Sequence, residues 1–176
     1  MIFRETALKD AFVIEIERRE DERGFFARSW CQREFETNGL NTRIAQCNIS
    51  LNYKKGTLRG MHYQAKPFEE AKLVRCTRGS LYDVIIDLRS DSQSFKKHLG
   101  FMLTPDNGKM LYVPEGFAHG YLTLEDNTEA HYQISEFYAP DHSSGFKWND
   151  PAFAIVWPAE VKVISERDRN YPDFRG

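Results

Sequence analysis

Residues 81–88 read LYDVIIDL, and this stretch is the clearest indicator of the fold. Its even-numbered residues are aromatic or aliphatic and share one face of an extended chain, whereas Asp83 and Asp87 lie on the opposite face. A period of two is typical of a half-buried β-strand. The same alternation recurs in FVIEIE at 12–17 and in AHYQI at 130–134. The sequence therefore predicts strands in all three places.

Turn-forming residues separate these strands along the whole chain. The connecting stretches include DERG, NYKKG, TRGS, PDNG and APDHSSG, which are rich in Gly, Pro, Asn, Asp and Ser. One short helix is expected where Cys31 and Phe35 stand four residues apart, with Asn38 and Gly39 as its stop signal. Many short strands with few helices predict an all-β fold, an antiparallel sandwich or barrel.

The overall composition restricts the class of protein. The chain has 176 residues, a length that suits one domain over residues 1–176. Lys and Arg number 24 against 26 Asp and Glu, so the formal charge of -2 argues against nucleic acid or a membrane surface as a partner. We see no signal peptide and no apolar run of membrane-spanning length. Three widely spaced cysteines fit reduced thiols in a cytoplasmic protein.

The stretch TLRGMHYQ at 57–64 places a cation and a titratable ring close together. In a regular strand, Arg59 and His62 would project to opposite faces, because they are three positions apart. Gly60 between them permits a bulge that would turn both side chains into one cavity. The alternative is that Gly60 only eases a barrel corner and His62 is an ordinary strand residue. Both interpretations are open on this segment alone.

Three other segments carry polar or titratable groups, each with a simpler explanation. Lys72 opens an apolar strand, a position where lysine is usually solvated. The stretch VPEGFAHGY at 113–121 predicts a rigid loop that carries His119, although a lone loop histidine is commonly a surface residue. Tyr132 and Tyr138 are six apart, so both would share one face of a continuous strand. They could pack in the core, or supply an acid and a stacking platform.

A metal site is not indicated. The sequence contains five histidines, none of which forms an HxH or H-x₃-H pair: His62, His98, His119, His131 and His142. No carboxylate stands beside them at a ligating spacing. We therefore expect a protein that uses no metal.

Taken together, the motifs resemble those of a known enzyme family. RGFF, QCNIS, GTLRGMHYQ, KLVR, YDVIIDLR, VPEGFAHGY, WNDP and SERD occur in the order seen in dTDP-4-dehydrorhamnose 3,5-epimerases, and the resemblance spans essentially the whole chain. It implies a cupin-like jelly roll, usually a homodimer, that needs no cofactor. It also implies a nucleotide-linked 4-keto-6-deoxy sugar as substrate, with inversion of the carbons that flank the ketone.

The resemblance also assigns roles to residues. His62 matches the general base, Tyr132 the acid on the opposite face, and Asp168 of SERD the aspartate that pairs with the base. Further substrate-contacting positions are matched by Arg23, Phe26, Gln46, Asn48, Arg59, Lys72, His119 and Tyr138. Among these, the matched roles of Arg59, Lys72 and His119 are around the sugar and the ketone oxygen. The matched role of Tyr138 is to stack on the base.

These residue types suit the chemistry. A hydrogen on the carbon next to a ketone is too weakly acidic to be lost unaided at neutral pH. Donors near the ketone oxygen must therefore stabilise the enolate. Imidazole, with an unperturbed pKa of about 6.5, is a suitable base, and an aspartate on its far nitrogen fixes the tautomer. Inversion then requires a different group to return the proton from the other side, which a tyrosine hydroxyl can do.

Two positions depart from the family pattern. The family commonly has glutamate where this chain has Arg28, and again near Ser143. Both concern nucleotide or substrate recognition rather than proton transfer. The sequence therefore leaves open a single-site epimerase, a CDP- or GDP-linked substrate, or a sugar-binding cupin without catalysis.

Overall fold

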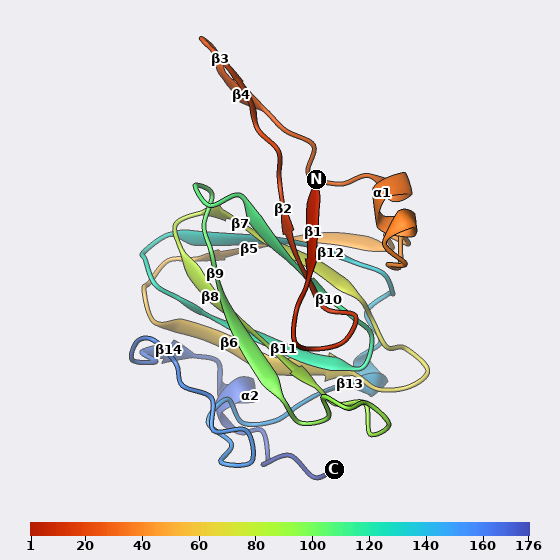
Figure 1. Ribbon diagram of the computed structural model, residues 1–176. Helices are drawn as coiled ribbons and strands as arrows, with labels where there is room; N and C mark the ends of the chain where they lie inside the picture. The colour runs from red at the N-terminus through yellow and green to blue at the C-terminus, as the bar shows by residue number, and fades with distance from the viewer.

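The computed structural model describes residues 1–176, which form two large β-sheets that face each other and a separate two-stranded sheet of β3 (Arg19–Asp21) and β4 (Gly24–Phe26) (Figure 1). The first sheet has the order β1 (Ile2–Glu5), β2 (Phe12–Glu15), β10 (Lys109–Val113), β7 (Lys72–Arg78), β12 (Thr128–Ile134) and β5 (Gln46–Asn52). The second has the order β13 (Ser143–Gly145), β6 (Thr57–Gln64), β11 (Phe117–Thr123), β8 (Leu81–Asp87) and β9 (His98–Leu103), and β14 (Val163–Ile164) pairs with β6 in parallel. The other pairings are antiparallel, which confirms the predicted all-β sandwich.

Helices are few and short, as expected. The first, α1 (Gln32–Thr37), buries Phe35 and is followed by Asn38 and by Gly39, whose φ is 71°. The second, α2 (Glu166–Arg169), follows a single 3₁₀ turn at Pro140–His142 in the chain. Neither α-helix has the length and apolar character needed to cross a membrane.

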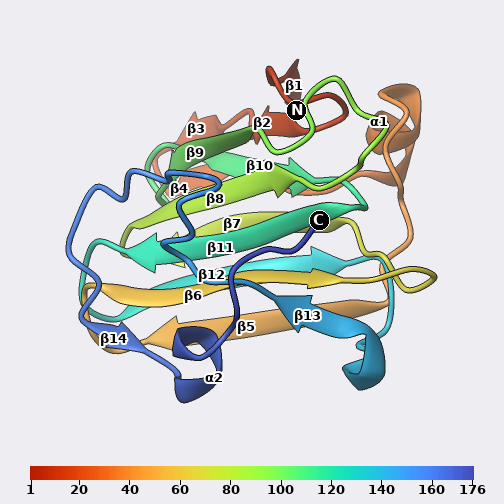
Figure 2. The same cartoon turned by 90° about the horizontal axis from the view of Figure 1, so that it is seen from below.

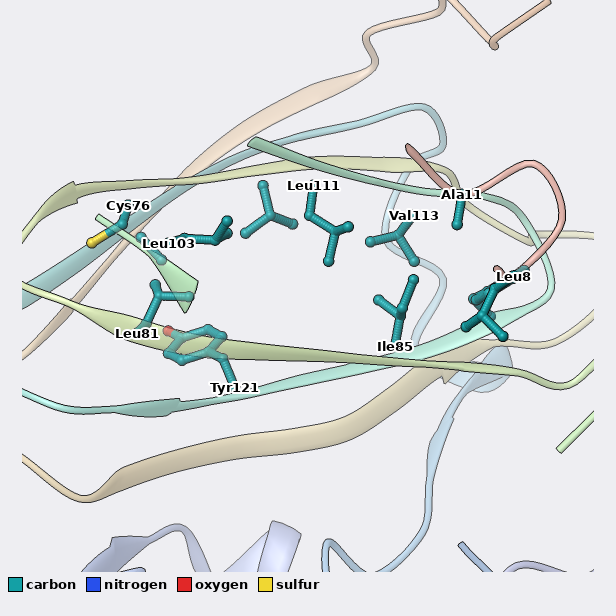
Figure 3. Packing of buried hydrophobic residues seen from close by; sticks show 12 residues of the cluster. Leu8, Ala11, Cys76, Leu81, Ile85, Leu103, Leu111, Val113 and Tyr121 are labelled. Atoms are coloured by element: carbon teal, nitrogen blue, oxygen red, sulfur yellow. The ribbon is translucent and has the colours of Figure 1, made fainter. Parts of the chain in front are cut away.

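The main core lies between the two sheets. Figure 3 shows Leu81 and Ile85 of β8 pointing toward Leu111 and Val113 of β10, and all four are almost fully buried. Leu81 and Ile85 share their face of β8 with Asp83 and Asp87. The acidic face of the LYDVIIDL strand therefore points into the sandwich, and the strand is not half-buried but buried on both faces.

The second face of β8 is buried because the C-terminal part of the chain crosses the outside of its sheet (Figure 2). Three phenylalanines of this part form a cluster over the sheet. The rings of Phe146 and Phe153 stack with centroids 4.8 Å apart, and Phe174 meets Phe146 edge-on at 5.3 Å. Val84 and Ile86 of β8 pack beneath them, both fully buried.

Asp87 shows how the fold accommodates a buried carboxylate. It accepts hydrogen bonds from Arg89 Nε and Nη2, from Ser92 Oγ and from Ser94 Oγ, at 2.6–2.9 Å. Burial alone would raise the pKa of Asp87, but these hydrogen bonds lower it to about 2. This carboxylate is fully satisfied.

Two expectations about local structure are wrong. The stretch 113–121 is a turn only at Pro114–Gly116, because β11 begins at Phe117 and places His119 inside a ladder. The strand β12 ends at Ile134, so Tyr132 and Tyr138 do not share a continuous strand.

The bulge allowed by Gly60 is present. Between β6 and β11, His62 pairs with His119 and Arg59 pairs with Tyr121, so three steps along β6 match two along β11. Gly60 has φ of 138°, and a Cβ there would lie 2.6 Å from the Cα of Gly120. Because His119 and Tyr121 share a face, the bulge brings Arg59 and His62 onto one face as well.

The C-terminal cover should stabilise the whole fold. We expect Phe146→Ala to lower the free energy of unfolding by about 3–5 kcal/mol, because Phe146 is 1% exposed at the centre of its cluster. Urea unfolding would measure the change. Val156→Ala is the matched control, since Val156 belongs to the same segment but is 81% exposed. Equal unfolding midpoints for the two variants would contradict the packing described here.

Candidate active site

A pocket of about 340 Å³ opens at the end of the sandwich where β5 and β7 begin and β6 and β12 end. Six of the residues predicted to be catalytic or substrate-binding line its walls: Gln46, Asn48, His62, Lys72, Tyr132 and Tyr138. The structure therefore brings these residues together from segments far apart in the chain.

A larger hollow of about 1020 Å³ lies beside this pocket, with Tyr63 and Gln64 lining both. None of the predicted catalytic or binding residues lines it. The side chain of Gln64 donates to the carbonyls of Phe68 and Phe137 and accepts from the backbone of Ala139. We place the candidate site in the smaller pocket, because the titratable groups converge there.

His62 is held by Asp168, as the resemblance implied. Its Nε2 lies 2.7 Å from Asp168 Oδ1, while Asp168 Oδ2 accepts from the backbone N–H of Gly60 at 3.2 Å. Ser165 caps α2 by accepting from the Asp168 N–H, which fixes the helix that carries the carboxylate. Burial alone would raise the pKa of Asp168, but the bonds from His62, Gly60 and Ser165 lower it below its ordinary value.

The ring of His62 is also held from the side. Tyr171 packs edge-on against it with centroids 5.9 Å apart. With Nε2 engaged by Asp168, Nδ1 is the ring nitrogen that is free to receive a proton from a substrate. The arrangement suits a general base of fixed orientation.

Tyr132 faces His62 from the other sheet. It lies on β12 of the first sheet, whereas His62 lies on β6 of the second, and both line the pocket. Burial raises the pKa of Tyr132, an effect that the nearby Arg59 partly offsets. A substrate between the two sheets would have one titratable group on each side.

Of the two cations predicted to lie near the ketone, Lys72 lines the pocket and Arg59 does not. Lys72 is only 9% exposed and pairs with Glu70 at 2.9 Å, so the expectation of a solvated lysine is wrong. Arg59 donates from Nε to the buried Asn52 at 2.7 Å. His119 does not line the pocket wall but is the cross-strand neighbour of His62.

The rim of the pocket is aromatic and cationic. Tyr138 is 55% exposed, and hydrogen bonding to Arg167 and then to Ser143 lowers its pKa. Arg167 Nη2 also donates to Ser143 Oγ at 3.0 Å. The backbone N–H of Tyr138 donates to Gln46, which ties the rim to β5.

Arg23 and Phe26 are not brought to this pocket. They lie on the hairpin of β3 (Arg19–Asp21) and β4 (Gly24–Phe26), which projects away from the sandwich (Figure 1). Arg23 is paired with Asp21 of the same hairpin, and Phe26 is 73% exposed.

Several residues of the site escaped the sequence reasoning. Arg167 precedes Asp168 in the SERD motif, and Glu70 lies two residues before Lys72, so proximity to predicted residues was the available signal. Asn52, which holds Arg59, gave none, because alternation along a strand does not reveal which face is interior.

The chain contains no group of three or more His, Cys, Asp or Glu side chains arranged to hold a metal ion. That the protein works without a metal stays a prediction.

Comparison with known proteins identifies the family. The family model described as dTDP-4-dehydrorhamnose 3,5-epimerase matches residues 5–176. The chain belongs to the dTDP-4-dehydrorhamnose 3,5-epimerase family. The enzyme of that name from Methanothermobacter thermautotrophicus is 41% identical, covering 98% of this chain and 94% of its own. As a member, the chain is an isomerase, and the cupin-like jelly roll is confirmed.

Solved structures of similar proteins agree closely with this fold. That of dTDP-4-dehydrorhamnose 3,5-epimerase from Bacillus anthracis, with TDP and PPi bound, superimposes with a TM-score of 0.95 at 41% identity, covering 98% of this chain and 99% of that one. A 3'-monoepimerase from Streptomyces bikiniensis, in complex with dTDP-quinovose, is 28% identical with a TM-score of 0.88, covering 96% and 85%.

The pairing of Asp168 makes a prediction about pH. Because the pKa of Asp168 is lower in the folded than in the unfolded chain, its stabilising contribution is present above the unfolded value of about 3.9 and is lost as pH falls through the folded value. We expect Asp168→Asn to be less stable than the wild type at pH 7, with a gap that narrows below pH of about 4. Urea midpoints across this range measure the gap. A gap that stayed constant would show that the carboxylate charge contributes nothing.

Proposed function

We propose that this epimerase inverts C3 and C5 of a dTDP-linked 4-keto-6-deoxyhexose, with His62 as base and Tyr132 as acid. The observation that carries the proposal is the placement of these two side chains on opposite sheets across one pocket. Epimerisation needs a proton to leave one face of a carbon and another to arrive on the opposite face, and a single group cannot do both.

In the first step, His62 Nδ1 takes the proton from the carbon beside the ketone. The electron pair moves onto the ketone oxygen and forms an enolate. Asp168 stabilises the imidazolium that results and prevents ring rotation, since it is anchored by Gly60 and Ser165. Tyr132 then delivers its proton to the other face, and the electron pair returns to carbon.

The enolate oxygen requires donors, which supply the main electrostatic stabilisation. Lys72 is suited to this role, because Glu70 holds its ammonium inside the pocket at 2.9 Å. The resemblance assigns Arg59 and His119 to the same region. Asn52 fixes Arg59 by its Nε and leaves the two terminal nitrogens of the guanidinium free.

The nucleotide would bind at the rim. Tyr138 offers an exposed ring for stacking, and Arg167 offers a guanidinium that is paired only with neutral groups there. The relatives at 41% identity are named as 3,5-epimerases of a dTDP sugar, which supports the thymidine nucleotide and inversion at both carbons. Ser143, where the family tends to have glutamate, keeps CDP- and GDP-linked sugars as the second candidates.

Two variants test the assignments. We expect His62→Ala to lower the rate of deuterium incorporation from heavy water by about 10³-fold or more, with dTDP affinity nearly unchanged. Tyr132→Phe should lose the inverted product but still exchange substrate protons, because the base survives. Proton NMR with the dTDP-4-keto-6-deoxy sugar measures both, with a downstream ketoreductase to trap the product and EDTA present throughout.

Other outcomes would change the proposal. Exchange at one carbon alone would identify a single-site epimerase. If the wild type exchanged protons only of a CDP- or GDP-linked sugar, the nucleoside would be reassigned. If it bound these sugars but exchanged the protons of none, it would be a non-catalytic sugar-binding protein. Normal epimerisation by Tyr132→Phe would mean that another group is the acid, and loss of the wild-type rate in EDTA would reveal a metal.

We also propose that the protein acts as a homodimer. Arg23 and Phe26 match substrate-binding positions but lie on a hairpin that projects from the body, so they can reach a nucleotide only in a second copy. The edge strand β5 exposes Ile49 and Leu51, which gives such a copy an apolar surface to cover. A cytoplasmic location and a single domain over 1–176 stay predictions from the sequence.

Mixing two inactive variants tests the dimer. His62→Ala lacks the base, and an Arg23→Ala, Phe26→Ala double variant lacks the hairpin contacts. If the hairpin acts across the dimer, a mixed dimer has one complete site, so an equal mixture should recover about one quarter of the wild-type activity after subunit exchange. A hairpin that served its own chain would give no recovery, and size-exclusion chromatography with light scattering would show whether dimers exist.

A further inference from the structure

Asp83 is a buried carboxylate that the fold does not explain. It lies on β8 with no exposed surface, and its Oδ2 has no hydrogen-bond partner. Its only side-chain partner is His119, whose Nε2 lies 2.5 Å from Asp83 Oδ1. An unpartnered buried acceptor is destabilising, so such a group in a native protein calls for a reason.

Asp87 provides an internal comparison. It lies on the same face of the same strand with the same zero exposure, yet it is bonded by Arg89, Ser92 and Ser94. Folding alone accounts for Asp87, because the bonds compensate its burial. The same reasoning does not account for Asp83.

His119 links Asp83 to the candidate site. It is the direct cross-strand neighbour of His62, and its side chain is 10% exposed. Its Nε2 is engaged by Asp83, and no group of the chain hydrogen-bonds its Nδ1. Nδ1 is therefore the ring nitrogen left free for a partner outside the chain.

Burial limits the charge that this pair can hold at low cost. A net charge on two groups this deeply buried is costly, and a neutral pair avoids that cost. The neutral pair is either carboxylate with imidazolium or carboxylic acid with neutral imidazole. In both forms, one proton lies between Asp83 Oδ1 and His119 Nε2, and the second proton is on Nδ1.

We propose that Asp83 is a positioning residue for epimerisation, which acts through His119 by keeping a proton on Nδ1 and presenting that N–H to the enolate oxygen. The inference rests on the proposed function and extends it to a residue outside the pocket wall. No proton is transferred by the pair: as His62 removes the carbon-bound proton, the new negative charge on oxygen is met by a donor already in place. Preorganised donors of this kind are effective because they need no reorientation during the reaction.

The test compares Asp83→Asn with Asp87→Asn. Asp83→Asn removes the charge that holds the second proton on His119, so kcat for deuterium exchange should fall by about 10- to 100-fold. KM should change little, and Tm should stay within a few degrees. Asp87→Asn should lower Tm by roughly 5–10 °C, because it loses charged hydrogen bonds, while kcat of the folded enzyme is unchanged.

A double variant shows whether Asp83 acts through His119. If it does, Asp83→Asn should cause no further loss of kcat in a His119→Ala background, since the intermediary is absent. An additional loss of the same size in that background would overturn the proposal. So would an Asp83→Asn enzyme that has wild-type kcat and the reduced Tm of Asp87→Asn.

The protonation state can be observed directly, without substrate. In ¹⁵N-histidine NMR spectra of the wild type near neutral pH, Nδ1 of His119 should carry a proton, with the signal assigned by its absence in His119→Ala. An unprotonated Nδ1 would overturn the inference even if Asp83→Asn failed to fold. This measurement needs no sugar nucleotide, so it is independent of the activity assay. A wild type without exchange activity would refute the proposed function, while the NMR spectrum would still show whether Nδ1 of His119 is protonated.

Discussion

The close contact between Gly60 of β6 and Gly120 of β11 is the constraint on which the candidate site depends. A Cβ at Gly60 would lie 2.6 Å from Gly120, so the bulge exists only because both positions lack side chains. The bulge moves Arg59 onto the face of His62, and the N–H of Gly60 then donates to Asp168. One irregularity in one strand thus sets the direction of the base and the position of its partner.

The sandwich supplies the second requirement of epimerisation, which is two separated proton-transfer groups. Because strands of both sheets line the pocket, His62 and Tyr132 come from different layers and are held apart by the thickness of the core. The C-terminal segment contributes in a different way. It buries the outer face of the second sheet with Phe146, Phe153 and Phe174, and it carries α2 to the back of His62.

The sequence predicted the strands well, because period-two alternation depends only on neighbouring residues. It could not show that the Asp83 face of LYDVIIDL lies between the sheets. The opposite, apolar face is buried instead by a C-terminal cover that is far away in the chain. The loop predicted for VPEGFAHGY was wrong for a similar reason. Gly120 suggests a loop locally, but here it allows β11 to approach Gly60 closely within a strand ladder. Motif resemblance found Arg23 and Phe26, yet one chain does not bring them to the pocket.

The two aspartates of β8 separate what folding demands from what chemistry demands. Both carboxylates are removed from solvent on one face of one strand, so differences in burial or backbone cannot explain their different surroundings. Asp87 has enough donors to make a charge stable in the interior, whereas Asp83 has a single titratable partner. A carboxylate that served only stability would be satisfied like Asp87 or replaced by an apolar residue. An under-satisfied carboxylate bonded to His119, the cross-strand neighbour of His62, fits a group whose benefit appears when negative charge develops in the pocket.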